Sequence, residues 1–384
     1  MEFDFDAVLD RASTDSLKWN IDPARWGRSD ILPLWVADMD FACPPCVAEA
    51  VRARAGHPVY GYPERSAGYG PSIAGWMKRR HGWDIDPEWI VYSPGVVPAL
   101  HFAVQAFTRP GEGVVIQPPV YHPFPVAIVA NGRRVIENPL VRGESGYAMD
   151  LDGLRSALDN GARLLILCSP HNPVGRVWRR KELEDVVGLC AERGVTIVSD
   201  EIHADLVLFG EPHICTAALS QAAARITACL TAPSKTFNIA GFAHANAIIP
   251  DPGLRKAFAS AIGRAGIEVS NIFGNVACEA AYAGGEAWLD ALLDYLRGNY
   301  AFLAEFAAAR LPGIDVLPLE ATYLAWLDCS GTGRDPGQLM REAGVWLNEG
   351  SMFGRGGEGF LRLNFACPRK ILEQALERLE QALA

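Results

Sequence analysis

The hydrophobic pattern changes its period repeatedly along the chain. Short apolar runs bounded by turn residues predict buried strands at 90–92, 114–117, 134–136, 164–168, 195–199, 226–231 and 245–249. Between several of these runs, apolar residues recur at helical spacing and predict helices, for example at 97–107 and 180–193. Such alternation is typical of an α/β fold in which helices flank a mostly parallel central sheet. Ligands of this fold class gather beyond the carboxyl ends of the strands.

The two ends of the chain do not follow this alternation. The first residues look irregular and end in the rigid segment 32–41, LPLWVADMDF. Long helices are expected at 288–309 and at 368–384, where four leucines recur at i, i+4, i+7 and i+11 and form one buried face. We therefore expect a smaller α+β domain built from both chain ends. The expected division is an N-terminal segment 1–48 within the small domain, a large domain 49–285 and a C-terminal small domain 286–384.

Composition excludes several classes of function. The 384 residues are 49% apolar and carry a formal net charge of −10, which argues against a nucleic-acid or anionic membrane surface. The acidic N-terminus lacks a signal-peptide pattern, and no run approaches the ~20 apolar residues of a membrane span. Nine scattered cysteines indicate reduced thiols, and the CxxC of Cys43 and Cys46 has no second ligand pair, so no metal site is expected. We expect a soluble, cytoplasmic protein that binds neither nucleic acid nor a membrane.

Three polar motifs each follow a strand-like run, so the expected sheet would bring them to one edge. Lys235 lies in TAPSKTFNIAGF, Asn172 in SPHNPVG and Asp200 in VSDEIH. Taken singly, each has an ordinary explanation: a snorkelling lysine, a turn-forming Asn-Pro pair, and a helix-capping or salt-bridged aspartate. Their joint position resembles the constellation that binds pyridoxal phosphate (PLP) in fold type I enzymes, the aspartate aminotransferase superfamily.

The resemblance implies a role for each residue. Lys235 would form the Schiff base with PLP, with an amine pKa lowered by its pocket. Asp200 would keep the ring nitrogen protonated, because a buried carboxylate beside a cation stays ionised. Asn172 would donate to the phenolic oxygen of the ring. His203 stands where many relatives carry a tyrosine, so we prefer a second polar contact to that oxygen over a metal ligand.

The phosphate of PLP needs amide donors at a helix N-terminus. The segment SPGVVPA ends a strand and opens an apolar helix, which makes the amides of Val96 and Val97 candidate donors. Ser234, directly before the lysine, is a further candidate. Tyr121, in QPPVYHP, would stack on the ring by resemblance, although an aromatic residue after two prolines is often simple packing.

Arg362 is the candidate clamp for a substrate carboxylate. It lies in the alternating segment GFLRLNF, where Leu361 and Leu363 face one side and Arg362 faces the other. The planar guanidinium matches a carboxylate with two parallel donors, which a lysine cannot do. The alternative is an arginine on the surface of an exposed strand.

Several motifs resemble the MalY/PatB group of fold type I enzymes, which are cystathionine β-lyases and cysteine-S-conjugate β-lyases. They are PLWVADMDF at 33–41, SPGVV at 93–97, SKTFNIAG at 234–241, YLAWLD at 323–328 and GRGGEG at 354–359. The likeness covers nearly the whole chain and implies a homodimer with shared active sites. Tyr62 would reach the neighbour's phosphate, and Ala37 and Tyr62 would contact the amino-acid substrate. The chain departs from many aminotransferases at Ala243, where they place a phosphate-binding arginine.

Three functions fit these residues. The leading hypothesis is α,β-elimination from a cysteine S-conjugate such as L-cystathionine, which gives a thiol, pyruvate and ammonia. An aminotransferase would use the same residues around PLP, so only the family motifs favour the lyase. A non-catalytic PLP-binding regulator would need a basic DNA-binding module, whereas only about 48 acidic-to-neutral residues precede the large domain.

Overall fold

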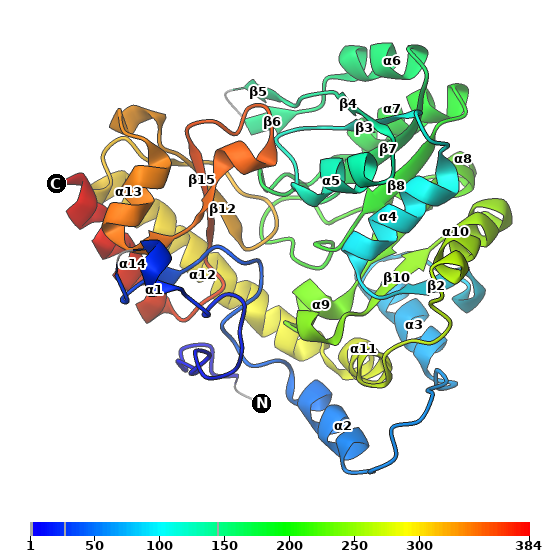
Figure 1. The fold of residues 1–384 in the computed structure, drawn as a ribbon, viewed down its shortest axis with the longest axis horizontal. Helices are drawn as coiled ribbons and strands as arrows, with labels where there is room; N and C mark the ends of the chain where they lie inside the picture. Colours follow the sequence, from blue (N-terminus) through cyan, green and yellow to red (C-terminus); the bar gives the residue numbers. More distant parts are fainter. Residues whose placement is uncertain (1–2, 27, 144–145) are drawn as a thin grey trace.

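The computed structural model describes residues 3–26, 28–143 and 146–384 (Figure 1). At its centre lies a seven-stranded sheet made of β2 (Ile90–Ser93), β3 (Gly113–Ile116), β4 (Arg134–Glu137), β7 (Ala162–Cys168), β8 (Thr196–Asp200), β9 (Thr227–Thr231) and β10 (Ala245–Ile248). The strand order is β2-β10-β9-β8-β7-β3-β4. β10 runs antiparallel to β2 and β9, and the four other pairings are parallel. The expected α/β fold with a mostly parallel sheet is confirmed, and each expected strand overlaps one of these seven.

Both faces of the sheet are apolar, and helices cover both. Val114 and Ile116 of β3 pack in one cluster with α4 (Val96–Phe107), α5 (Pro123–Ala130) and α10 (Pro252–Arg264). Val115, between them, belongs to the opposite cluster with α6 (Leu151–Asp159), α7 (Arg180–Glu192) and α8 (Gln221–Ile226). Successive side chains of a strand point to opposite faces, so a strand buried on both sides has no polar stripe. α4 and α7 are the helices expected at 97–107 and 180–193, within one residue at each end.

Three adjacent parallel strands, β7, β8 and β9, end in register with one another. Cys168 of β7 pairs with Asp200 of β8, and Asp200 pairs with Leu230 of β9. The segments that leave these strand ends carry the polar motifs of Asn172 and Lys235. The parallel register therefore brings the three motifs to one edge of the sheet.

A smaller sheet lies beside the large one, on the left of Figure 1. Its order is β11-β12-β15-β14, formed by β11 (Asp315–Val316), β12 (Leu324–Asp328), β14 (Asn348–Glu349) and β15 (Phe360–Asn364). The chain's beginning joins this region, because β1 (Leu32–Pro33) pairs with β13 (Val345–Trp346). We therefore propose one smaller unit made of both chain ends, with boundaries near residues 48 and 285. The large unit would take in the short hairpin of β5 (Val141–Gly143) and β6 (Gly146–Ala148).

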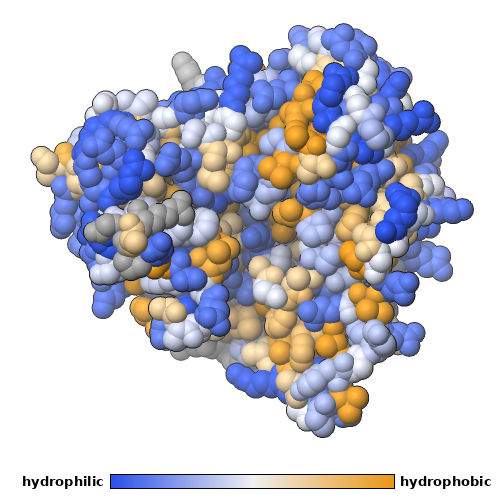
Figure 2. All heavy atoms as spheres, viewed as in Figure 1, coloured by the Kyte–Doolittle hydropathy of each residue, from blue (hydrophilic) through white to orange (hydrophobic). Residues whose placement is uncertain are grey.

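The remaining helices are α1 (Pro23–Trp26), α2 (Pro45–Ala55), α3 (Tyr69–His81), α9 (Pro233–Thr236), α11 (Ile272–Gly284), α12 (Glu286–Arg310), α13 (Pro336–Ala343) and α14 (Arg369–Leu383). On α14, three of the four predicted leucines, Leu372, Leu376 and Leu379, are fully buried. No helix in the described part of the chain is long and apolar enough to cross a membrane. Figure 2 shows hydrophilic side chains over most of the rim of this face, with apolar side chains gathered along its middle.

Candidate active site

A cavity of about 240 Å³ lies beyond the carboxyl ends of β7, β8 and β9. It brings together all of the predicted site residues except Tyr62 and Arg362, namely Ala37, Val96, Val97, Tyr121, Asn172, Asp200, His203, Ser234 and Lys235. Cys168, Ile202 and His244 also line the cavity, and their sequence context gave no prediction of a role in the site. They adjoin or lie near the strand ends, and only the tertiary structure distinguishes them from ordinary core residues.

Lys235 lies on α9, a single helical turn that begins two residues after the end of β9. Its Nζ donates a 2.5 Å hydrogen bond to the carbonyl oxygen of Ala37. The hydroxyl of Tyr323 donates to the same oxygen at 2.9 Å. Removal from water lowers the pKa of the amine to about 8, although the charges of Asp38 and Asp200 act in the opposite direction. A substantial fraction of Lys235 is therefore a neutral base near pH 8.

Asp200 ends β8 and is almost fully buried. Burial raises the pKa of its carboxyl to about 7, while a hydrogen bond from the backbone N–H of Ile202 and the charge of Lys235 lower it. The expectation of a fully ionised Asp200 presumed a cation beside it. A protonated ring nitrogen would supply that cation and draw the pKa of Asp200 down.

His203 and Asn172 both line the cavity. Burial, together with the charges of Lys235 and Arg362, lowers the pKa of His203 to about 3, so its imidazole is neutral. Its Nδ1 is buried without a hydrogen-bond partner, which is unusual for a ring nitrogen in a protein core. The Oδ1 of Asn172 accepts a 3.1 Å hydrogen bond from Arg362, which leaves the amide nitrogen of Asn172 to donate elsewhere.

The N-terminus of α4 opens at the cavity, where Val96 and Val97 are its first two residues. Gly95 precedes them with a φ of 137°, a conformation that only glycine adopts without strain, and no side chain caps the helix. The first amides of a helix have no intrahelical acceptor, so an uncapped N-terminus is an anion-binding site. Ser234 lines the same cavity, and Ala243 lines it where an arginine would stand in many aminotransferases.

Arg362 lies on β15 and is only 4% exposed, so the alternative of a surface strand arginine is wrong. Its partners are neutral oxygens: Asn172 Oδ1, the carbonyl of Trp35 at 2.9 Å and Asn348 Oδ1 at 2.5 Å. Its Nε is buried without a partner, and burial lowers its pKa to about 10. A buried guanidinium held by neutral groups retains its attraction for an anion.

The segment 35–41 is tied to the site by side chains that sequence reasoning missed. Asn364 Nδ2 donates to two of its carbonyl oxygens at 2.6 Å each, and Asn238 Nδ2 donates to two others at 2.9 and 2.7 Å. The fully buried Lys18 pairs with Asp40 at 2.6 Å and fixes the segment from its other side. The two asparagines stand close in sequence to Arg362 and Lys235, and this proximity was the only signal available for them.

Tyr62 lies outside the cavity and is 94% exposed, so its predicted contact with the phosphate of a second chain stays a prediction. Tyr121 lines the cavity, and burial raises the pKa of its hydroxyl. Its neutral ring is available for stacking.

Within the described residues, Glu201, His213 and Cys215 form one group that could hold a metal, with ligand atoms within 4.8 Å of one another. The carboxylate of Glu201 already accepts hydrogen bonds from Thr216 N–H and Ser199 Oγ, each at 2.8 Å, and lies 3.1 Å from Nε2 of His213. Although burial opposes it, these contacts lower the pKa of Glu201 to about 2. We interpret the group as a satisfied polar network of the core and assign no metal to it.

Comparisons with known proteins agree with this geometry. The family model for aminotransferase class I and II matches residues 29–379. Cystathionine beta-lyase PatB of Bacillus subtilis (strain 168) is 44% identical over 385 residues, which cover 99% of this chain and 100% of PatB. Protein MalY of Escherichia coli (strain K12) is 37% identical over 388 residues, with 99% of each chain covered. Cystalysin from Treponema denticola, whose crystal structure contains a pyridoxal 5′-phosphate cofactor, matches with a TM-score of 0.95 and 36% identity, covering 100% of this chain and 99% of cystalysin.

The chain belongs to the aminotransferase class I and II family, and its architecture is PLP fold type I. Within that family it falls in the group that contains PatB and MalY, as its motifs indicated. The family depends on PLP, and the cavity suits that cofactor. It offers an uncapped helix N-terminus for a phosphate, an amine of lowered pKa on Lys235, a buried carboxyl on Asp200 and an unpartnered ring nitrogen on His203.

Proposed function

We propose that the protein is a PLP-dependent carbon–sulfur β-lyase that cleaves L-cystathionine or a related cysteine S-conjugate to a thiol, pyruvate and ammonia. The observation that carries the proposal is the meeting of Lys235, Asp200 and the uncapped N-terminus of α4 in one small cavity. The reaction type comes from the relatives, since PatB is named a cystathionine beta-lyase and is similar over its whole length.

The cofactor would be held at three points. Lys235 would bind it covalently, Asp200 would hold a proton on the ring nitrogen, and the amides of Val96 and Val97 with Ser234 would bind the phosphate. Asn172 and His203 would donate toward the phenolic oxygen, and Tyr121 would pack on the ring. When bound, PLP stabilises the negative charge that develops at the substrate Cα.

The substrate would be oriented by Arg362, whose guanidinium would take the α-carboxylate in place of one of its present neutral oxygens. The segment 35–41, which contains Ala37, would lie on the side of the substrate opposite Arg362. Once the substrate's amine has displaced Lys235 from the cofactor, its free Nζ would remove the Cα proton, because the lowered pKa of about 8 makes the neutral amine available near that pH. The Cβ–S bond then breaks with the electron pair leaving on sulfur, and water completes the release of pyruvate and ammonia.

The alternative is an aminotransferase, which would use the same lysine and the same clamp. The two are separated by incubating the purified holoenzyme with L-cystathionine in the absence of a keto acid. A lyase releases pyruvate over many turnovers, whereas an aminotransferase stops after one equivalent per site. One equivalent of the keto acid of cystathionine per site, without catalytic release of pyruvate, would contradict the lyase assignment.

We further propose a homodimer in which Tyr62 binds the phosphate of the neighbouring site. Tyr62 is 94% exposed in a segment with two other exposed apolar side chains, Val59 and Tyr60, so it is free to reach another chain. Light scattering should give twice the mass of 41.6 kDa. Tyr62→Phe should weaken PLP retention without changing that mass. We place the enzyme in the cytoplasm, where its nine cysteines, all unpaired, would stay reduced.

A further inference from the structure

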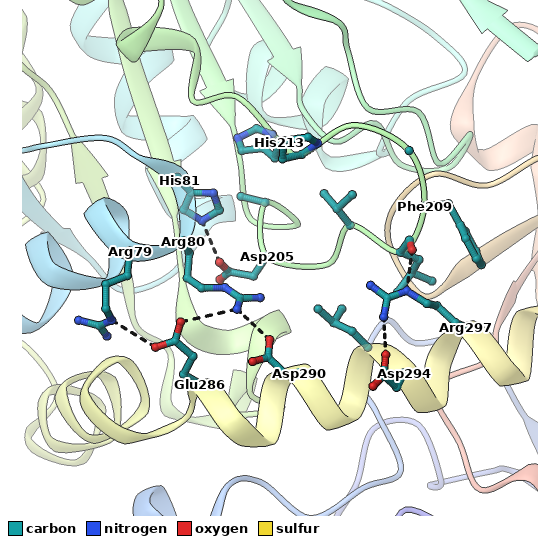
Figure 3. Close-up of a pocket in the computed structure, with 16 residues that line it drawn as sticks. Arg79, Arg80, His81, Asp205, Phe209, His213, Glu286, Asp290, Asp294 and Arg297 are labelled. Carbon is teal, nitrogen blue, oxygen red and sulfur yellow. Dashed lines mark hydrogen bonds and ion pairs between the residues drawn. The ribbon is translucent and has the colours of Figure 1, made fainter.

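A second depression, of about 590 Å³, lies between α3, the segment 204–213 and α12 (Figure 3). Its rim carries charges that pair with one another: Arg79 with Glu286, Arg80 with Asp290 and Arg297 with Asp294. Figure 3 shows these pairs along α12, with His81 and Asp205 deeper in the groove. Because the rim charges are matched, the groove offers little attraction to a charged ligand. Asp205 differs from the other groove residues because one of its partners, Thr236, directly follows Lys235.

Asp205 is a buried carboxylate that joins three separate segments. Its Oδ1 accepts hydrogen bonds from Trp76 Nε1 at 3.0 Å and His81 Nε2 at 2.8 Å, both on α3. Its Oδ2 accepts a 2.8 Å hydrogen bond from the hydroxyl of Thr236. Burial alone would raise the pKa of Asp205, but His81, Thr236 and Trp76 hold it below its usual value. Asp205 is therefore an ionised acceptor with all of its donors in place.

The position of Asp205 in the chain links both halves of the cofactor site. It lies five residues after Asp200, in the same turn whose Ile202 N–H donates to Asp200. Its partner Thr236 directly follows Lys235 on α9. One carboxylate thus connects the segment that carries Asp200 with the segment that carries Lys235.

α9 needs such support because it is only one turn long. A single helical turn fixes several backbone angles for one hydrogen bond and is unstable by itself. The chain leaves α9 through Asn238, which has a φ of 56°, a left-handed conformation that asparagine tolerates better than most residues. The side chains of Thr236 and Asn238 supply the external bonds of this turn, one to Asp205 and the other to the 35–41 segment.

We propose that Asp205 is a positioning residue for Lys235, acting through the hydroxyl of Thr236. A displacement of the amine by about 1 Å is enough to lower the rate of a proton transfer by a hundredfold. The inference rests on the proposed function only in assigning Lys235 to the removal of the Cα proton. It does not depend on which bond breaks afterwards.

The test compares Thr236→Val with Thr236→Ser in the PLP-loaded enzyme. Valine has nearly the shape of threonine but cannot donate to Asp205, whereas serine keeps the hydroxyl. The readout is exchange of the Cα proton of L-alanine for deuterium, followed by NMR, because alanine has no leaving group and exchange reports Lys235 alone. Thr236→Val should exchange at least tenfold more slowly than the parent, and Thr236→Ser should stay within threefold. The KM and the PLP content of both variants should be nearly unchanged.

Thr216→Val is the matched control. Thr216 is also fully buried, but its hydrogen bonds go to Ser199 Oγ at 2.9 Å and to the carboxylate of Glu201 at 2.8 Å rather than to Asp205. The Thr216→Val variant should lose about as much thermal stability as Thr236→Val does, but it should keep the parental rate of Cα proton exchange. Equal losses of exchange in both valine variants would show a general effect of core polarity and would overturn the proposal.

Asp205→Ala tests the same bond from its other side. If Asp205 acts through Thr236, then adding Asp205→Ala to Thr236→Val should slow exchange by less than threefold further. Should Asp205→Ala fail to fold, the comparison of Thr236→Val with Thr236→Ser still tests the proposal. If Thr236→Val exchanges the Cα proton within twofold of the parental rate, the inference is wrong. A parent enzyme that exchanges the proton normally but releases no pyruvate would contradict only the proposed function.

Discussion

The cofactor cavity and the groove along α12 contain similar kinds of side chain, but these side chains differ in how completely their charges and hydrogen bonds are paired. In the groove, Arg80 and Asp290 meet at 2.8 Å, and the neighbouring charges are matched in the same manner. At the cavity, His203 has a buried nitrogen without a partner and α4 begins without a cap, and Arg362, which donates to the lining residue Asn172, is held by neutral oxygens. The cavity therefore holds polar groups whose interactions are incomplete.

The difference shows where binding free energy is available. A charge already paired in solvent gains little from a new partner. A buried group with an unmet donor or acceptor gains much, because the cost of removing it from water has already been met by the fold. The shifted pKa values follow the same division, since Lys235, Asp200 and His203 depart strongly from their usual values because they are buried. Substitutions in the two regions should therefore have very different effects.

Replacing Lys235 by alanine should give the largest effect. Without the amine there is neither a covalent attachment point nor a base in the cavity, so kcat should fall by at least about a thousandfold. The measurement is pyruvate release from L-cystathionine, together with borohydride reduction and peptide mapping of the parent enzyme. Recovery of the pyridoxyl label at a residue other than Lys235 would show that the cavity has been assigned wrongly.

Asp200→Asn should retain PLP but lose most activity. Removing one charged interaction at the reacting centre costs ~3 kcal/mol of barrier, which is about a hundredfold in kcat. Steady-state kinetics at saturating PLP would measure it. A turnover near that of the parent would show that Asp200 has only a structural role.

The same variant tests the raised pKa of Asp200 in the cofactor-free protein. A folded-state pKa of about 7 lies above the unfolded value near 4, so the folded state holds a proton that the unfolded state has released between these pH values. The parent apoprotein therefore loses stability as pH rises through this window, and Asp200→Asn does not. The Tm of the variant minus the Tm of the parent should therefore be several degrees larger at pH 8 than at pH 5. A difference independent of pH would contradict it.

Arg362→Lys should reduce kcat/KM by roughly a hundredfold, or ~2.7 kcal/mol, because lysine keeps the charge but not the two parallel donors. The absorbance of bound PLP should change little, since lysine keeps the positive charge that acts on Lys235 and His203. Kinetics with L-cystathionine would measure the loss. If kcat/KM stays within a few-fold of the parent, the carboxylate is bound elsewhere.

Asp290→Asn, in the groove, should have the smallest effect. The pair with Arg80 is exposed, and such pairs contribute ~0–1 kcal/mol. The kcat/KM should remain within twofold of the parent, and urea unfolding should show a small loss of stability. A tenfold loss of activity would mean that the groove takes part in catalysis, and the contrast between the two regions would fail.

Much of the fold was determined by the sequence alone, because its signals are local. All seven strands of the large sheet were predicted from short apolar runs, and α4, α7 and α14 from helical spacing. Lys235, Asn172 and Asp200 could be singled out for the same reason, since each stands at or shortly after the end of a strand that can be located from its neighbours.

Only the tertiary structure decided what surrounds those residues. The acceptor of Lys235 is the carbonyl of Ala37, 198 positions away, and Arg362 donates to a carbonyl 327 positions away. The sequence left the burial of Arg362 open, because a strand with alternating side chains can lie at a surface or between two layers. Asn238, Asn364 and Asp205 resemble ordinary turn or core residues until their distant partners are known. Local periodicity determines elements and the ends where chemistry can lie, whereas hydrogen bonds between distant segments depend on how those elements pack.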